Sequence, residues 1–409
     1  MAQFQKIIND PVYGFITIDD ALIYKIIEHP YYQRLRNIHQ MALAYLVYPG
    51  ATHSRLHHSL GAYHLMCNAI AQLSTKGVNI TNNEAQAAKI AILLHDVGHG
   101  PFSHTLEGQL IKGVHHENIS LAIMQLLNKE FNGALETAIA IFKNTYPKHF
   151  LHQLISGQLD VDRLDYLNRD SFYTGVTEGV IGYHRIIKML QVVNDNLVVE
   201  EKGIYSVENF LIARRLMYEQ VYLHKTVLAA EKILVQIIKR AKYLIANNTL
   251  IGEGNLYNFL NNTININTNN WLQAYMQIDD IDVLSHLKIW QHHSDTILSN
   301  LCKMIINRTL LRCQYIKNSL GATNYKNMLS LTAKAFNCSQ AHASWYIIKG
   351  TTSHSMYNNS SETITILKKD GTLEPISNFD NTLLTLNSIK TIEKHFVCYP
   401  KNIVINKIN

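Results

Sequence analysis

The sequence lacks the features that would assign it to a membrane or disulfide-rich class. No apolar run approaches the roughly 20 residues that a helix needs to span a bilayer. The amino-terminal MAQFQKIINDP has no apolar stretch of the kind that a secretory signal requires. The cysteines are scattered without a close CxxC pair, at Cys67, Cys302, Cys313, Cys338 and Cys398. We therefore expect a cytoplasmic protein with reduced thiols and no membrane partner.

Charge is also scarce. Charged residues make up 17% of the 409 residues, and the formal net charge is only +6. Such a small excess argues against a protein that coats nucleic acid, although it allows a local basic pocket for phosphates. The apolar content of 47% is typical of a globular chain that buries a sizeable core. We expect one large domain or two to three ordinary ones, without a nucleic-acid partner.

Histidine, in contrast, is abundant and unevenly distributed. The chain has 21 histidines, and 11 of them lie at or before His116. More than half of the imidazoles thus lie in less than a third of the chain. Because imidazole binds metals and titrates near neutral pH, metal or proton chemistry is expected in this amino-terminal part.

Helical periodicity dominates the chain and predicts a mainly α fold. The predicted helices cover residues 22–27, 60–73, 83–94, 120–127, 134–142, 210–243 and 299–316. Hairpins are predicted near 196–206, with Gly203 close to the turn, and at 362–376, around a Lys-Asp-Gly turn. Residues 247–270 are Asn-rich and predict a surface loop. We expect a helical domain over 1–320 and a smaller mixed α/β part over 321–409.

The segment LLHDVGHGPFSHTLEG, residues 93–108, follows an apolar run with polar and metal-binding side chains. His95 and Asp96 end the predicted helix, where both side chains can reach one ion. Further ligands are expected in SRLHHSLG (54–61) or LDVDRLDYLNRD (159–170). Such His/Asp mixtures suit Mn, Fe, Co, Ni or Zn, and a metal there could activate water for hydrolysis. Alternatively, the aspartates of the second segment form a helical salt-bridge lattice with Arg163 and Arg169.

Six segments carry a resemblance to a known family. They are INDPVYGFI (8–16), HPYYQRLRNIHQ (29–40), YPGATHSRLHHSLG (48–61), LLHDVGHGPFSH (93–104), HHEN (115–118) and DVDRLDYLNRD (160–170). The chain resembles the HD-domain metal-dependent phosphohydrolases, most closely the branch of deoxynucleoside triphosphate triphosphohydrolases. The resemblance covers residues 1 to about 175 and extends more weakly to Lys225. It implies an HD-domain helical core and a homo-oligomer, a dimer or larger.

The resemblance implies one divalent metal ion, of Mn, Fe, Zn, Ni, Co or Mg, and allows a second Mg on the substrate phosphates. The implied ligands are His58, His95, Asp96 and Asp162, with His57 as the alternative to His58. The implied catalytic residues near the phosphates are His99, His104, His116 and Glu107, which would orient one of the imidazoles.

Substrate contacts follow from the same resemblance. Arg55 and Arg163 would meet phosphates, Tyr166 and Asp170 would face the sugar, and Arg214 and Tyr222 would add further contacts. The alternative for Arg214 is a solvated helix face. A nucleotide activator site would map to Glu28, Gln33 and Arg36, which could equally form an ordinary helix surface. Glu219 and Gln220 stand where the animal enzyme of that branch has two arginines.

The expected function is hydrolysis of a dNTP substrate, of the dGTP type, to a deoxynucleoside and triphosphate. One alternative is a phosphohydrolase for another nucleotide, such as a monophosphate, a cyclic nucleotide or an alarmone. The other is a nucleotide sensor that binds without turnover.

Overall fold

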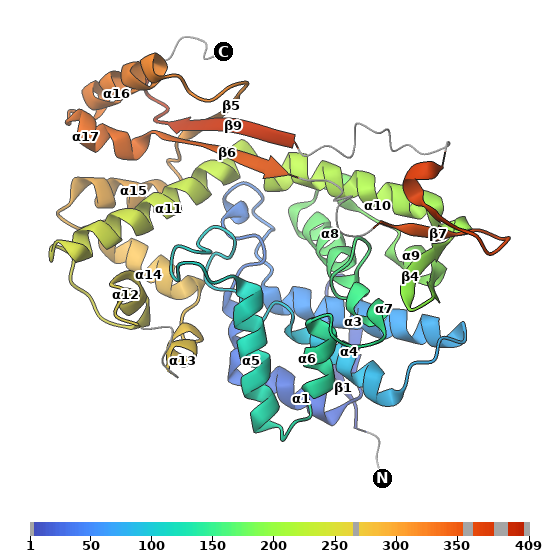
Figure 1. Ribbon diagram of the computed structural model, residues 1–409. Coiled ribbons are helices and arrows are strands. Elements are labelled where there is room, and N and C mark those ends of the chain that lie inside the picture. The colour runs from blue at the N-terminus through green and yellow to red at the C-terminus, as the bar shows by residue number, and fades with distance from the viewer. Residues whose placement is uncertain (1–3, 265–269, 355–362, 380–391, 405–409) are drawn as a thin grey trace.

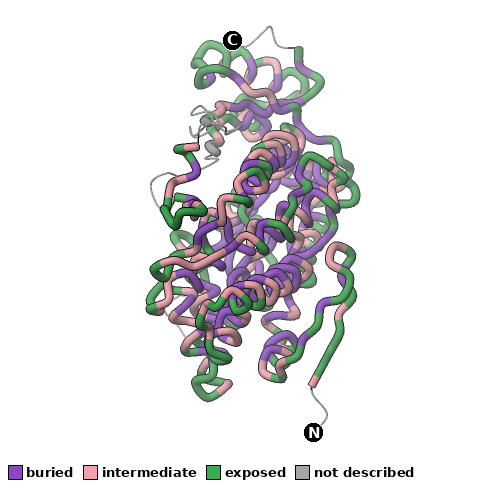
Figure 2. Tube along the Cα trace, turned by 90° about the vertical axis from the view of Figure 1, so that its right-hand side faces the viewer, coloured by how far each residue is buried: buried purple, intermediate pink, exposed green. Residues whose placement is uncertain are grey.

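Apolar residues at helical spacing build the body of the molecule. The computed structural model describes residues 4–264, 270–354, 363–379 and 392–404. Helix α3 (Arg55–Thr75) buries Leu65, Ala69 and Leu73, which share one face because they are four residues apart. It packs against α4 (Asn82–Leu94) and α8 (Val161–Thr174). These three helices belong to one large hydrophobic core, which appears as the buried interior in Figure 2.

The mainly α fold class is confirmed (Figure 1). The other helices before residue 250 are α1 (Ala21–Glu28), α2 (Pro30–Gln33), α5 (His116–Glu130), α6 (Glu136–Phe142), α7 (His149–Gln153), α9 (Tyr183–Met189), α10 (Ile204–Met217) and α11 (Lys225–Ala246). They are followed by α12 (Asn255–Leu260), α13 (Trp271–Tyr275), α14 (Asp280–Trp290), α15 (Thr296–Ile306), α16 (Ala322–Phe336) and α17 (Gln340–Ala343). No helix in the described ranges is both long and apolar enough to cross a membrane.

The strands form three small sheets. An antiparallel hairpin joins β1 (Lys6–Asp10) and β2 (Gly14–Ile18). A second sheet has the order β3 (Leu190–Val193), β4 (Asn196–Glu200), β7 (Thr365–Leu367) and β8 (Leu373–Pro375). The third has the order β5 (Arg312–Ile316), β9 (Ile392–Tyr399) and β6 (Ile348–His354). Strands from both sides of residue 320 therefore share two sheets, and the domain boundary there stays a prediction.

Two predicted helices are shorter than the periodicity indicated. The helix predicted over 210–243 is two helices, α10 and α11, separated by a π-helical turn, Tyr218–Tyr222. The helix predicted over 299–316 ends with α15 at Ile306, and its last five residues form strand β5 instead. Cys313 and Ile316 are buried in that strand. The apolar spacing that predicted a helix here therefore reflects burial of a strand.

Turns account for the remaining differences. The hairpin predicted at 196–206 is displaced, because its turn is formed by Asn194 and Asp195, both at positive φ. Gly203 instead lies where a Cβ would approach Val199 to 2.6 Å. The hairpin predicted at 362–376 is formed by β7 and β8, although residue 362 lies outside the described residues. Helix α12 lies within the predicted Asn-rich loop, of which residues 265–269 are not described.

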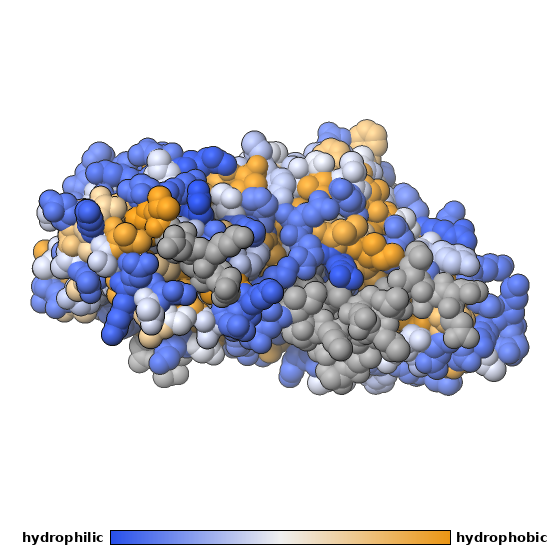
Figure 3. Space-filling model, turned by 90° about the horizontal axis from the view of Figure 1, so that it is seen from above, coloured by the Kyte–Doolittle hydropathy of each residue, from blue (hydrophilic) through white to orange (hydrophobic). Residues whose placement is uncertain are grey.

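The surface agrees with a globular chain. Figure 3 shows hydrophilic side chains over most of the visible face, interrupted by separate apolar patches. Such exposed apolar patches are ordinary for folded proteins, which have too little polar surface to cover themselves. Helices α16 and α17 lie at the opposite end of the molecule from α1 and β1 (Figure 1).

Candidate metal centre

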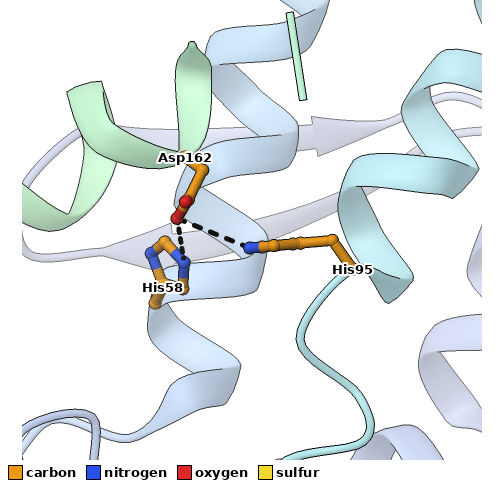
Figure 4. A group of neighbouring side chains, drawn as sticks. All are labelled: His58, His95 and Asp162. Carbon is orange, nitrogen blue, oxygen red and sulfur yellow. Dashed lines mark ion pairs between the residues drawn. The ribbon is translucent and has the colours of Figure 1, made fainter. Parts of the chain in front are cut away.

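Three helix ends bring the predicted ligands together. His58 lies in the first turn of α3, His95 directly follows α4, and Asp162 lies in the first turn of α8. Figure 4 shows the three side chains converging from these separate segments. Oδ1 of Asp162 lies 3.0 Å from Nε2 of His58 and 3.4 Å from Nε2 of His95. Their donor atoms all lie within 4.8 Å of one another, which suits a single ion.

Local capping interactions fix where helices α4 and α8 begin. The Thr81 hydroxyl accepts from the backbone N–H of Glu84, whose carboxylate accepts from the N–H of Thr81, so α4 begins with a reciprocal cap. In α8 the carboxylate of Asp160 accepts from the backbone N–H of Arg163 at 2.7 Å. The sequence therefore positions Asp162 two residues after a buried cap.

The two imidazoles are held with Nε2 directed into the cluster. Nδ1 of His58 bonds Asp165 at 2.7 Å, and Nδ1 of His95 bonds the carbonyl of Ile92 at 2.6 Å. Because a carboxylate and a carbonyl only accept, both Nδ1 atoms donate, and Nε2 is left with a lone pair when the ring is neutral. Both Nε2 atoms are buried and point at the Asp162 carboxylate. This arrangement fits a bound divalent cation.

Asp96, the fourth implied ligand, lies beside the same cluster. Its carboxylate oxygens lie 3.4 Å from Nε2 of His95 and 3.7 Å from Nε2 of His58. One of them also contacts the Arg55 guanidinium at 2.5 Å. The structure thus places Arg55, the implied phosphate contact, against a ligand position.

The electrostatics of the cluster favour positive charge. Burial lowers the pKa of His58, but hydrogen bonds and charges from Asp162 and Asp165 outweigh it and raise that pKa to about 10. Burial lowers the pKa of His95 as well, but the charges of Asp96 and Asp162 outweigh burial and raise that pKa. Although burial alone would raise it, the histidines hold the pKa of Asp162 well below its ordinary value. A divalent cation would supply the positive charge that this acidic pocket attracts.

The two interpretations of the aspartate-rich segment apply to different residues. Asp162 belongs, with His58 and His95, to the group of candidate ligands, here called the metal cluster. Asp165 instead pairs with Arg169 at 3.0 Å, one turn further along α8. Arg169 also reaches Asp10 of β1 at 2.8 Å, and Arg163 pairs with Asp160. The predicted salt-bridge lattice therefore exists alongside the metal cluster, and through Asp165 it supports His58.

Replacing Asp165 by asparagine should weaken metal binding by about 10- to 100-fold, because His58 loses the carboxylate that orients it. Asp10→Asn is the matched control, since it disturbs the same Arg169 ion network without touching His58. Metal titration of both variants checks the expectation. Equal affinities in the two variants would mean that the ion network, not the carboxylate on His58, determines binding.

The other motif histidines form a second group beside the metal cluster. The rings of His99 and His116 stack with centroids 3.8 Å apart, and the His104 centroid lies 5.0 Å from that of His99. One oxygen of Glu107 accepts from the backbone N–H of His116 at 3.0 Å and from its Nδ1 at 2.9 Å. Hydrogen bonding from His104 and His116 holds the pKa of Glu107 well below its ordinary value. Glu107 thus orients His116 and leaves its Nε2 available.

A cleft gives access to the cluster. Its volume is about 490 Å³, and its lining includes His95, Asp96 and Asp162 from the metal cluster together with His116. The opposite wall comes from α5, the end of α6 and α7. A ligand entering this cleft would therefore meet the metal ligands and the second histidine group at once.

The implied sugar contacts also gather in one place. One oxygen of Asp170 accepts from the Tyr222 hydroxyl at 2.5 Å, and the other lies 2.7 Å from Nε2 of His53. Tyr222 and Tyr166 have ring centroids 6.4 Å apart. Sequence reasoning missed His53 as well as Asp165. The signal for His53 was its position directly before SRLHH, within a quoted segment.

Arg214 is buried, so the interpretation of a solvated helix face is wrong for this residue. Only 8% of it is exposed, whereas the neighbouring Arg215 is exposed. The Nε and one terminal nitrogen of Arg214 make no hydrogen bond in the ranges that the structure describes. A buried guanidinium with unpaired donors is suited to receive an anion such as a phosphate.

Two further motif positions have ordinary contacts. The Gln33 side chain accepts from Nε of Arg36 at 2.6 Å and donates to the carbonyl of Ile27 at 2.6 Å. Glu219 pairs with Lys394 of β9. Whether Glu28, Gln33 and Arg36 bind an activator stays a prediction.

Comparison with known proteins assigns the family. Residues 55–170 match the HD domain, and residues 181–259 match the HD associated region. The uncharacterized protein YwfO of Bacillus subtilis is 30% identical over 98% of this chain and 93% of its own. The crystal structure of a phosphohydrolase from Bacteroides thetaiotaomicron superposes with a TM-score of 0.93 at 48% identity, over 97% of this chain and 100% of that one. This chain belongs to the HD-domain phosphohydrolase family.

A relative that matches a smaller part of the chain has a named activity. The deoxynucleoside triphosphate triphosphohydrolase SAMHD1 of Gallus gallus is 30% identical over 59% of this chain. The match covers 46% of that protein, so it spans about half of the animal enzyme.

Proposed function

We propose that the protein hydrolyses deoxynucleoside triphosphates to a deoxynucleoside and inorganic triphosphate. The observation that carries the proposal is the buried, unpaired guanidinium of Arg214, on a helix next to the turn that bears Tyr222. Tyr222 bonds Asp170, which lies two turns after Asp162 in the same helix, α8. Groups suited to phosphate, sugar and metal therefore lie along two adjoining elements.

In the proposed reaction, water attacks the α-phosphorus, the bond from phosphorus to the 5′ oxygen breaks, and that oxygen takes up a proton. A divalent ion held by His58, His95, Asp96 and Asp162 would acidify water and neutralise charge on the phosphate. Arg163 and Arg214 supply positive charge for the remaining phosphates.

His116 is suited to deliver the proton to the leaving oxygen. Its Nδ1 donates to Glu107, so the proton available for transfer lies on Nε2. The Glu107 carboxylate also stabilises the positively charged imidazolium before transfer.

The test is a product assay on the purified protein with Mn or Mg. Each dNTP is offered singly and as a mixture, and tripolyphosphate and deoxynucleoside are measured with the bound metal. Tripolyphosphate from a dNTP is the expected result, and a requirement for the mixture would support an activator site. Bound metal without tripolyphosphate would overturn the proposal in favour of another phosphoester, and binding without any turnover would favour a sensor.

A further inference from the structure

The loop that carries His99 and His104 has a strained backbone. It connects α4 to α5, and two of its residues other than glycine, Phe102 and His104, have φ values of +44° and +62°. Residues other than glycine avoid this region because the side chain crowds the backbone there. Such a backbone persists only where surrounding contacts hold it.

Those contacts come from a segment far away in sequence, Tyr275–Asp280, which joins α13 to α14. The Tyr275 hydroxyl donates to the carbonyl of Gly98 at 3.3 Å. Next to it, a Cβ on Gly100 would lie only 2.4 Å from the same hydroxyl, so the two segments pack closely. Asp280 accepts from the backbone N–H of Phe102 at 2.6 Å. The last bond restrains one of the two strained residues directly.

A third segment completes the support. Arg34, which is buried, donates from Nε to the carbonyl of Ile278 and from a terminal nitrogen to the carbonyl of His99, each at 2.8 Å. The second oxygen of Asp280 accepts from the backbone N–H of His39 at 2.8 Å and lies 2.7 Å from Nδ1 of the same residue. Asp280 is only 1% exposed, so both of its oxygens are committed to protein groups in a dry environment.

We propose that Asp280 is a positioning residue that holds the strained loop, and with it His99 and His104, in place for turnover. It touches neither substrate nor metal and acts through the amide of Phe102. The proposed role in turnover rests on the proposed function, because it assigns His99 and His104 to the reacting phosphates. The restraint on the loop is independent of any substrate.

The experiment compares Asp280→Ala, Asp280→Asn and Asp279→Ala in the metal-loaded protein. Asp279 is the matched control, since it caps the same helix through Ile281 and bonds Asn37 without touching the loop. Displacement of a catalytic group by about 1 Å can cost about 100-fold in rate, so Asp280→Ala is expected to lower kcat by about 10- to 100-fold. KM and bound metal should stay close to those of Asp279→Ala, whereas Tm should fall further in Asp280→Ala, because the buried N–H groups of His39 and Phe102 lose their acceptor.

Asp280→Asn should recover part of kcat, because its amide oxygen can still accept from Phe102. Hydrogen exchange of the 98–106 amides is measured in parallel and should accelerate in Asp280→Ala but not in Asp279→Ala. Equal exchange in both alanine variants would overturn the restraint on the loop, whatever the substrate is. Faster exchange with unchanged kcat, in a protein that hydrolyses dNTPs, would overturn the positioning role.

Discussion

Replacing His58 by alanine is expected to remove the bound metal and to leave less than about 1% of the phosphohydrolase activity. Loss of a residue that merely orients a ligand costs about 10- to 100-fold in metal affinity, so loss of a ligand itself should exceed the upper end of that range. The adjacent His57 provides the matched control. Its Nδ1 bonds the hydroxyl and backbone N–H of Ser54, and it lies outside the group of residues that could hold the ion. His57→Ala should retain metal and activity, and lose about 1 kcal/mol of stability with the helix cap.

His58 is fully buried, so its alanine variant could lose metal simply by unfolding. A second variant that is expected to fold is therefore required. Asp162→Asn serves this purpose, because 28% of that side chain is exposed and the substitution keeps its shape. It should lose metal and activity as His58→Ala does. Metal analysis, Tm and turnover on the same preparations distinguish ligand loss from unfolding. If His57→Ala lost the metal and His58→Ala kept it, the assignment of the pair would be reversed.

The residues of the site could be predicted from the sequence, whereas the contacts that hold their side chains in place could not. The order of the histidine- and aspartate-containing segments carried the family resemblance, and the structure brings His58, His95 and Asp162 together. The sequence could not show that Asp165 rather than solvent faces Nδ1 of His58, because that contact joins residues 107 positions apart. It also could not show that Arg55 lies against Asp96, because the partner of a charged side chain depends on which segments the fold brings together.

Tertiary contacts likewise explain why one long predicted helix is broken. The apolar spacing continues through Tyr218–Tyr222, so periodicity alone indicates no interruption. In the structure the Tyr48 hydroxyl donates to the carbonyl of Gln220, and Tyr222 bonds Asp170. A π-helical turn rearranges backbone partners at such a place, often at a functional site. The displaced hairpin differs, because Gly203 and the pair Asn194-Asp195 are both turn formers, and only the pair lies between the two strands.

Metal affinity is expected to rise steeply with pH, by about tenfold per pH unit and by about 30-fold between pH 7 and 8.5. The metal-free pocket raises the pKa of His58 to about 10, so this ring is protonated throughout the range and must lose a proton before Nε2 can bind an ion. Binding at pH 7.5 should accordingly release about one proton from His58. Calorimetric titrations in buffers of different ionisation enthalpy measure this number directly. A flat affinity and no proton release would show that His58 is already neutral in the free protein.

The same linkage gives the metal-free protein a distinct pH dependence of stability. A folded pKa of about 10, above the ordinary value of 6.5, means that the contribution of His58 is complete below pH 6.5. It is lost as the pH rises towards 10, at up to about 1.4 kcal/mol per pH unit. Metal replaces the proton on Nε2, so the metal-loaded protein should not show this loss. The difference in Tm between the loaded and metal-free forms should therefore widen from pH 7 to 8.5. It should widen equally in His57→Ala, because that variant keeps the His58 pocket intact, whereas a constant difference would contradict the protonated state of the free site.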